Sequence, residues 1–248
     1  MNKTEKLKTG TSGWHYSHWK GAFYPEDIKN RDMLEYYADN FGTAEINNSF
    51  YRLPDIKTMK NWASRVPKGF LFAMKASRYI THMKKLKPDK NSIKKLMRRH
   101  DALGSKKGPI LFQMPGKFGF NGERLETFLK ALPKGKQYAF EFRDKGWFRQ
   151  ETYEILSKAK AALCIYHFKG YESRMQTTAD YVYVRLHGPA GAYEGEYGKK
   201  GLKKWADAVS EWLRQGKKVY FYFDNDQNGY APKDAMRLLE MAARHKGG

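Results

Sequence analysis

Charged side chains recur at the carboxyl ends of short apolar runs, where an enzyme built on strands would place its reactive groups. Glu45 stands between Ala44 and Ile46, and Glu141 and Arg143 end a run of aromatic residues. Carboxylates transfer protons, whereas guanidinium and ammonium groups bind the oxygens of phosphates and carboxylates. The corresponding position in other runs is taken by Lys75, Gln113, Arg185, His187 and Asp224. This combination predicts acid/base chemistry on a charged substrate.

The spacing within these runs predicts strands that bring the charged residues together. In residues 181–187, aliphatic residues at the even positions alternate with Tyr183, Arg185 and His187. Successive side chains of a strand point to opposite faces, so one face of each strand is apolar and the other is polar. Strands with one face under helices and with converging polar ends are typical of a (β/α)8 barrel, whose active site lies at the carboxyl ends of the strands.

We predict two sets of roles at this rim. The catalytic set, which would transfer protons, is Glu45, Glu141, His187 and Asp224. The substrate-binding set is Lys75, Arg143, Arg185, Asn47, Gln113, Tyr51, Trp14 and Asn225. Buried ion pairs are weak evidence for stability, because lost hydration offsets their attraction. We therefore favour a site with shifted proton affinities over a layer of salt bridges that only closes the barrel.

Two other interpretations of the same residues stay open. The pair Glu45 and Glu141 would suit glycoside hydrolysis, which needs two acids roughly 5 to 9.5 Å apart. His82, His167 and His187, with nearby carboxylates, would offer nitrogen and oxygen ligands to zinc or manganese. The cationic side chains in the same mouth would repel a metal. We therefore predict no cofactor and keep a divalent metal as the alternative.

Length and composition indicate one globular domain over residues 1–248, the usual size of one such barrel. No run approaches the roughly 18 apolar residues of a membrane span, and the polar start lacks the apolar core of a signal peptide. The single cysteine, Cys164, excludes an internal disulfide. We expect a cytoplasmic protein that does not contact membranes; its oligomeric state is not indicated.

The formal net charge of +21 indicates that polyanions are partners. Residues 84–107 alone contain ten basic and two acidic residues, with apolar residues spaced to allow an amphipathic helix. Its basic face would be a non-catalytic surface for nucleic acid, whose phosphates attract such a face. A merely solvated helix face explains the same run, and a lysine-rich proteome explains the same total charge.

The expected elements alternate along the chain, with one irregular step. Strands are expected at 8–14, 44–47, 70–76, 109–114, 138–143, 162–166, 181–187 and 219–224. Helices are expected from residue 30 to Gly42, at 55–66, within 84–107, and at 123–132, 150–161, 202–214 and 234–244. Eight strand-then-helix steps predict a single α/β (β/α)8 TIM-like barrel that is irregular after strand six.

Motifs along nearly the whole chain resemble the YecE-like family, the domain of unknown function number 72. They include 10–14 (GTSGW) with 23–25 (FYP), 45–47 (EIN) with 49–51 (SFY), and 75–76 (KA) with 81–82 (TH). They continue with 112–115 (FQMP), 141–143 (EFR) and 183–188 (YVRLHG), and with Asn225, Gly229 and Ala231. The resemblance implies a TIM-barrel-like fold and no established reaction.

The leading hypothesis is a hydrolase that acts on a phosphodiester bond by acid/base chemistry at the rim. Its substrate would be a phosphorylated small molecule or nucleic acid. The two alternatives are a glycosidase-like barrel and a non-catalytic nucleic-acid-binding protein. Aromatic residues in rim loops would stack on sugars or on bases under either enzyme hypothesis.

Overall fold

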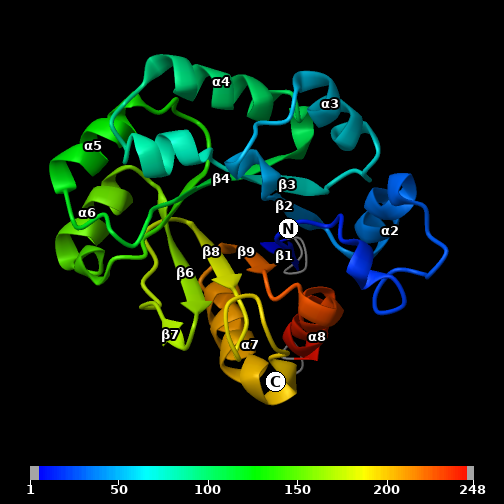
Figure 1. The fold of residues 1–248 in the computed structure, drawn as a ribbon. Helices are drawn as coiled ribbons and strands as arrows, with labels where there is room; N and C mark the ends of the chain where they lie inside the picture. The colour runs from blue at the N-terminus through cyan, green and yellow to red at the C-terminus, as the bar shows by residue number, and fades with distance from the viewer. Residues whose placement is uncertain (1–5, 245–248) are drawn as a thin grey trace.

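The computed structural model describes residues 6–244, whose eight parallel strands form a nearly closed barrel inside a ring of helices (Figure 1). The strands pair in the order β1-β9-β8-β6-β5-β4-β3-β2. Their bounds are β1 Leu7–Thr11, β2 Thr43–Ile46, β3 Leu71–Lys75, β4 Lys107–Gln113, β5 Tyr138–Glu141, β6 Ala162–Phe168, β8 Tyr181–Leu186 and β9 Lys218–Phe223. The predicted α/β TIM-like barrel is confirmed.

The barrel closes between β1 and β2, where two main chains come unusually close. Ser12 and Glu45 form an isolated parallel bridge, and the Gly13 amide donates to the Glu45 carbonyl at 2.8 Å. A Cβ atom at Gly10 would lie 2.1 Å from the Thr43 carbonyl oxygen. Glycine at position 10 therefore permits this approach, because a side chain would clash with backbone.

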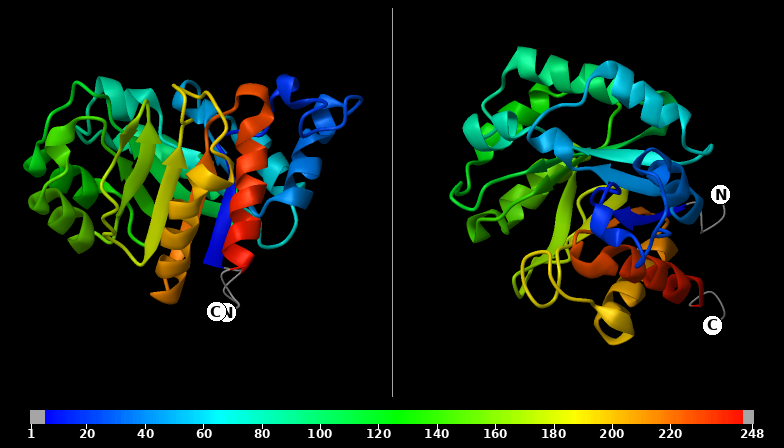
Figure 2. Two further views of the ribbon diagram at one scale, coloured as in Figure 1. Left: turned by 90° about the horizontal axis from the view of Figure 1, so that it is seen from below. Right: turned by 45° about the vertical axis from the view of Figure 1, so that its right-hand side comes forward.

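Seven helices cover the barrel in the described part of the chain. They are α2 Met33–Asn40, α3 Ile56–Ser64, α4 Lys90–Asp101, α5 Gly122–Ala131, α6 Gln150–Lys158, α7 Gly198–Arg214 and α8 Tyr230–Arg244. Asp55, Asp89 and Asn121 accept hydrogen bonds from amides in the first turns of α3, α4 and α5. Helices α7 and α8 pack side by side and each begin four residues before the predicted start (Figure 2).

No helix follows β6, which corrects the expectation of eight complete strand-then-helix steps and confirms the irregularity predicted there. The chain turns at Lys169 and Gly170, both with positive φ, and returns as the short strand β7, Tyr171–Glu172. Strand β7 pairs antiparallel with β6 through His167 and Glu172. A β hairpin therefore replaces the missing helix.

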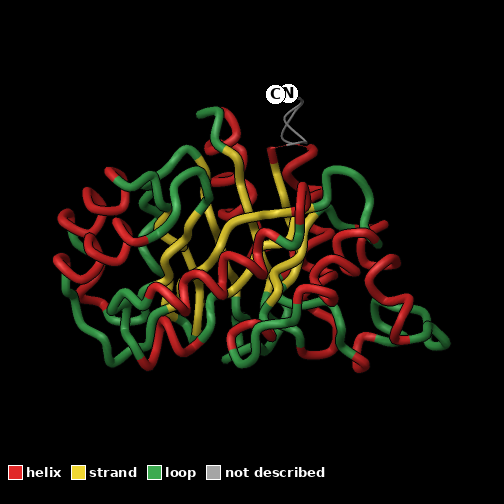
Figure 3. Tube along the Cα trace, turned by 90° about the horizontal axis from the view of Figure 1, so that it is seen from above, coloured by secondary structure: helices red, strands yellow, loops and turns green. Residues whose placement is uncertain are grey.

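The buried side chains form two groups. The larger lies between the strands and the surrounding helices, which Figure 3 shows outside the central strands. The smaller lies inside the barrel and is rich in tyrosine, with Tyr181, Tyr183, Tyr220 and Tyr222 beside alanine and Cys164. These inward residues share the inner face of the strands with the charged residues at the carboxyl ends, as the predicted alternation requires. No helix within residues 6–244 combines the length and apolar character that crossing a bilayer requires.

Candidate active site

One guanidinium lies at the centre of the charged cluster at the carboxyl ends of the strands. Arg185, the penultimate residue of β8, has no exposed surface. Its Nη2 atom lies 2.8 Å from Glu45 Oε1 and 2.9 Å from Asp224 Oδ2, and its Nη1 atom lies 3.0 Å from Glu141 Oε2. Arg185 thus joins carboxylates that come from β2, from β5 and from just after β9.

Glu45 is fixed by three donors. Its Oε1 atom accepts from Ser12 Oγ at 2.6 Å and from Arg185, and its Oε2 atom accepts from the Tyr183 hydroxyl at 2.6 Å. Burial and the neighbouring Glu45 charge raise the pKa of Tyr183 far above its usual value. Tyr183 therefore stays protonated and donates to Glu45 throughout the physiological range.

Glu141 is held as a carboxylate. Gln113 Nε2 donates to its Oε1 atom at 2.7 Å, and Arg143 Nη2 lies 2.5 Å from the same oxygen. Burial alone would raise the pKa of Glu141, but Arg143 and Arg185 hold it well below its ordinary value. The buried thiol of Cys164 lies 3.7 Å from Glu141 Oε2, and burial raises the pKa of that thiol well above its usual value.

His187 links the arginines to Asp224. Its Nδ1 atom lies 2.9 Å from Asp224 Oδ2, and its Nε2 atom lies 2.9 Å from Arg143 Nη2 and 3.2 Å from Arg185 Nη1. Arginine only donates, so Nε2 is the acceptor and the proton is on Nδ1, facing Asp224. Burial and Arg185 lower the pKa of His187, while Arg185 and His187 outweigh burial and lower the pKa of Asp224. His187 is therefore a neutral imidazole at neutral pH.

Arg143 retains one unused donor. Its guanidinium carbon lies 4.5 Å from the centre of the Tyr166 ring and 4.2 Å from that of Phe168. Its Nη2 atom bonds to Glu141 and His187, but its Nη1 atom is buried with no hydrogen-bond partner in the described chain. A buried donor without a partner is costly, and an acceptor at Arg143 Nη1 would remove that cost.

Lys75, the last residue of β3, has no carboxylate within ion-pair distance in residues 6–244. Its side chain is 7% exposed, and its Nζ atom lies 4.5 Å from the centre of the Phe50 ring. Burial, reinforced by Arg185, lowers the pKa of Lys75 to about 8. Lys75 is therefore a partly deprotonated amine near neutral pH, unlike an ordinary surface lysine.

The structure brings seven of the twelve predicted side chains into direct contact and places Lys75 beside them. The contacting residues are Glu45, Gln113, Glu141, Arg143, Arg185, His187 and Asp224. These are the residues whose strand ends and alternation pointed to one rim. The parallel strands β2, β4, β5, β8 and β9 end at the same edge and so supply them all.

Four predicted side chains are not part of this contact network. Trp14 is buried in the core with its ring edge-on to Trp62 at 5.1 Å, and Tyr51 is 77% exposed. Asn225 Nδ2 donates to the Gly195 carbonyl at 2.8 Å and to Asp234, which holds the loop after β9. Asn47 is half-buried at the turn after β2. Loop packing, which alternation does not describe, decides these positions.

Three residues of the site were missing from the predicted set. Ser12 and Tyr183 both bond to Glu45, and Tyr183 occupied the same inward register as Arg185 in the sequence pattern. Asp226, two residues after Asp224, has its pKa raised by burial and by the Asp224 charge. The sequence offered a signal for Tyr183 through its register with Arg185 and for Ser12 through the motif at 10–14 (GTSGW), whereas Asp226 lies in an irregular segment after β9.

Cationic side chains occupy the place that a metal would take. Within residues 6–244, no three or more His, Cys, Asp or Glu side chains are arranged to hold a metal ion. Arg185 already lies between the three carboxylates. His82 Nδ1 lies 2.9 Å from Thr81 Oγ1, and His167 Nδ1 lies 2.7 Å from the Tyr197 hydroxyl. Of the three histidines in the metal alternative, His187 contacts Asp224, and no ion pair within residues 6–244 joins His82 or His167 to a carboxylate.

Comparisons with known proteins agree on one family. The model of the family described as "Protein of unknown function DUF72" matches residues 8–248. The UPF0759 protein YunF of Bacillus subtilis is 25% identical over 268 aligned positions, covering 94% of this chain and 93% of that protein. The crystal structure of the DUF72 family protein TM1631 of Thermotoga maritima is 28% identical with a TM-score of 0.87, covering 96% of this chain and 99% of that one.

A more distant structure shows the same fold. The DUF72 family protein EF0366 of Enterococcus faecalis is 18% identical with a TM-score of 0.80, covering 96% of this chain and 95% of that one. The match of the family model over almost the full length confirms the resemblance that the sequence motifs indicated. The chain therefore belongs to the DUF72 family, whose members share this TIM-barrel-like fold.

Proposed function

We propose that the protein is an enzyme that performs acid/base chemistry on a phosphate-bearing substrate at the rim, with Lys75 as the proton-transfer group. The observation that carries the proposal is the environment of Lys75, which is buried at the end of β3 without a carboxylate partner and has a pKa of about 8. An acid/base group works best when its pKa is near the working pH. Such perturbed groups in the mouth of a barrel are candidates for function.

The environment of Arg143 supports the proposal that the substrate is an anion. Its buried Nη1 atom lacks a partner, while Tyr166 and Phe168 fix the plane of the guanidinium. A planar guanidinium donor suits a phosphate oxygen. Arg185 has a different role, because its two terminal nitrogens already contact three carboxylates. Arg143 would bind the anion, and Arg185 would position the carboxylates around it.

Three observations support assigning proton transfer to Lys75 instead of to the carboxylates and His187. Glu141 and Asp224 have lowered pKa values and bond to cations, which makes them poor proton donors near pH 7. His187 is neutral, and its Nε2 atom accepts from two arginines. These side chains would instead hold Arg143 and Arg185 in place, which leaves proton transfer to Lys75.

The same observations weigh against glycoside hydrolysis. That reaction needs one carboxylic acid with a raised pKa beside a second carboxylate. Here Glu45 and Glu141 are both bound to Arg185, and the pKa of Glu141 is lowered. A sugar substrate would also leave the free donor of Arg143 and the amine of Lys75 without a charged partner.

Nucleic-acid binding on α4 is a separate candidate with its own observation. Helix α4 buries Ile93, Leu96 and Met97 and exposes Lys94, Lys95 and Arg98 on its opposite side. None of the three exposed side chains has an ion-pair partner within residues 6–244. A basic face of this kind attracts phosphates and releases counterions on binding, so its affinity would fall steeply with salt.

The proposal is tested by binding and turnover of phosphate compounds. Isothermal titration with inorganic phosphate, followed by a panel of phosphomonoesters and short oligonucleotides, would compare the wild type with Lys75→Met and Arg143→Gln. The matched control is Lys57→Met, an exposed lysine of α3. The proposal predicts that Arg143→Gln weakens phosphate binding about tenfold and that Lys75→Met abolishes turnover. Unchanged binding and turnover in both variants would overturn it.

A further inference from the structure

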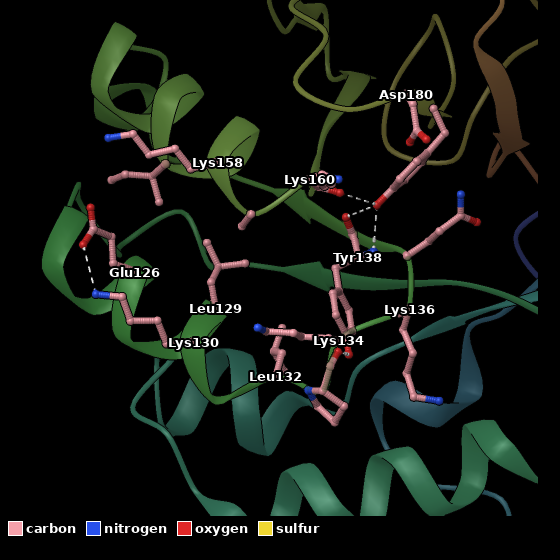
Figure 4. A pocket seen from close by; sticks show the side chains of 16 residues that line it. Glu126, Leu129, Lys130, Leu132, Lys134, Lys136, Tyr138, Lys158, Lys160 and Asp180 are labelled. Atoms are coloured by element: carbon pink, nitrogen blue, oxygen red, sulfur yellow. Dashed lines mark hydrogen bonds and ion pairs between the residues drawn. The ribbon is translucent and has the colours of Figure 1, made fainter.

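A second basic site lies at the opposite end of the barrel, where β5 and β8 begin (Figure 4). A cavity of about 950 Å³ opens there between α5 and α6. Its lining includes two acidic side chains, Glu126 and Asp180, against five lysines. The lysines are Lys130, Lys134, Lys136, Lys158 and Lys160.

Four of the lysines come from two segments that repeat one pattern, and Lys130 lies in α5. The loop before β5 contains lysine, Gly135 and lysine, and the end of α6 with the following turn contains lysine, Ala159 and lysine. Each segment has a residue with positive φ, Gly135 at 77° and Lys160 at 52°. A lysine rarely adopts this conformation, so Lys160 is held there by its surroundings.

Tyr181 ties the two segments together. Its hydroxyl accepts from the Tyr138 amide and donates to the Tyr138 carbonyl, both at 2.8 Å, and the Lys160 carbonyl lies 3.4 Å from the same hydroxyl (Figure 4). Tyr181 is buried inside the barrel. Tyr181 therefore holds the backbone at Tyr138 and Lys160 in place before any ligand binds, which lowers the entropic cost of binding at this end of the cavity.

Three of the lysines have a charge that is available to pair with a bound anion. Lys130 lies 3.7 Å from Glu126, and Lys136 pairs with Asp101. Within the described chain, no ion pair involves Lys134, Lys158 or Lys160, and all three side chains are exposed. The walls between them are apolar and include Leu129, Leu132, Pro133 and Ile155.

We propose that this cavity binds an anion that carries several phosphates on an apolar or aromatic body, such as a nucleoside triphosphate. The volume is within the usual range for small-molecule sites, roughly 300–1,000 Å³. The three free lysines would contact the phosphates, and the apolar walls would contact the body. This basal site lies at the end of the strands away from Lys75 and does not depend on the proposed rim chemistry.

The test is isothermal titration of the full chain with ATP and with inorganic tripolyphosphate at about 0.15 M salt, where long-range attraction is largely screened. The test variant is the triple substitution Lys134→Gln, Lys158→Gln and Lys160→Asn, because asparagine tolerates positive φ. The control removes three exposed lysines that lie outside both the cavity and α4, Lys29→Gln, Lys57→Gln and Lys60→Gln. Thermal melting checks that both variants fold.

We expect the test variant to bind ATP about tenfold more weakly and the control to change by less than about twofold. The test variant should keep the turnover that depends on Lys75 at the rim, which separates this site from the rim. Equal loss in the test variant and the control would overturn the proposal, because it would show attraction by net charge alone. Absence of ATP binding, or tripolyphosphate binding as tight as ATP, would also contradict it.

Discussion

Arg185 Nη2 lies 2.8 Å from Glu45 Oε1 although neither side chain has any exposed surface. This contact crosses the mouth of the barrel from β8 to β2. The carboxylates around Arg185 are buried and share its guanidinium, and Glu141 also pairs with Arg143. The cluster therefore acts as a rigid frame, beside which Lys75 and the free nitrogen of Arg143 stay available.

Replacing Arg185 should destabilise the protein severely. Arg185→Met would leave Glu45, Glu141 and Asp224 buried without their shared cation, which costs about 3–5 kcal/mol when one partner of a buried pair is removed. Urea unfolding followed by circular dichroism measures the change. The exposed and salt-bridged Arg214→Met is the control, with an expected change below about 0.5 kcal/mol. A loss below about 1 kcal/mol for Arg185→Met would show that the frame does not depend on this residue.

Removing the hydroxyl of Tyr183 tests whether its hydrogen bond to Glu45 stabilises the protein. Tyr183→Phe keeps the ring but deletes the donor that lies 2.6 Å from Glu45 Oε2. We expect a loss of about 1–3 kcal/mol in the free energy of unfolding, because a buried carboxylate oxygen loses its partner. Tyr51→Phe, at a 77% exposed position, should change stability by less than about 0.5 kcal/mol. Equal effects of the two substitutions would contradict this role.

The buried charge of Lys75 should lower the free energy of unfolding of the protein at neutral pH. Its pKa is lowered from 10.5 to about 8 in the folded state, so burial penalises its charged form. The penalty is fully present below pH 8, falls as pH rises from about 8 to 10, and is absent above the unfolded value. Lys75→Met should therefore stabilise the protein by about 1–3 kcal/mol at pH 7 and by less at pH 10. A destabilised variant at pH 7 would contradict this account.

The carboxylates of the cluster should make the stability of the protein depend on pH in the acidic range. The folded-state pKa values of Glu141 and Asp224 are lowered, so their stabilising contribution is present above the unfolded values and is lost as pH falls through the folded ones. Stability should decline below about pH 4, where unfolded carboxylates begin to bind protons. Urea unfolding from pH 7 to pH 3 measures this. A Glu141→Gln variant should show a shallower decline, and an identical slope would contradict the assignment.

The seam between β1 and β2 should not tolerate a side chain. Gly10→Ala would place Cβ 2.1 Å from the Thr43 carbonyl oxygen, so the strands would have to separate. Overpacking of this kind costs about 1–3 kcal/mol or more. Gly119→Ala is the control, because a Cβ at Gly119 meets nothing within 4 Å. Similar melting temperatures of the two variants would show that the seam is more open than the structure indicates.

Much of the barrel and of the cluster was predictable because both depend on regular strands. The alternation around Arg185 and Glu141 fixed which side chains point inward, and parallel strands ending at one edge brought them together. The roles were less predictable. Whether Glu141 gives up a proton depends on the two arginines beside it, and the lowered pKa of Lys75 depends on burial. Neither property follows from residue spacing.

Irregular segments account for the remaining differences. Trp14 follows β1 in a loop, and its burial against Trp62 depends on how that loop folds over α3. The hairpin after β6 has no periodic pattern to indicate it, apart from the turn residues Lys169 and Gly170. Loop conformation is determined by tertiary packing, so it was not accessible from hydrophobic periodicity.

The most direct test of the central claim is the titration of the Lys75 amine by heteronuclear NMR of protein whose lysines carry isotope labels, assigned with the Lys75→Met variant. The account predicts that the Lys75 resonances titrate with a midpoint near pH 8, well below the value of about 10.4 that is usual for a lysine side chain. A Lys75 midpoint at or above 10 would contradict the account, since the amine would then be fully charged at neutral pH and unable to accept a proton.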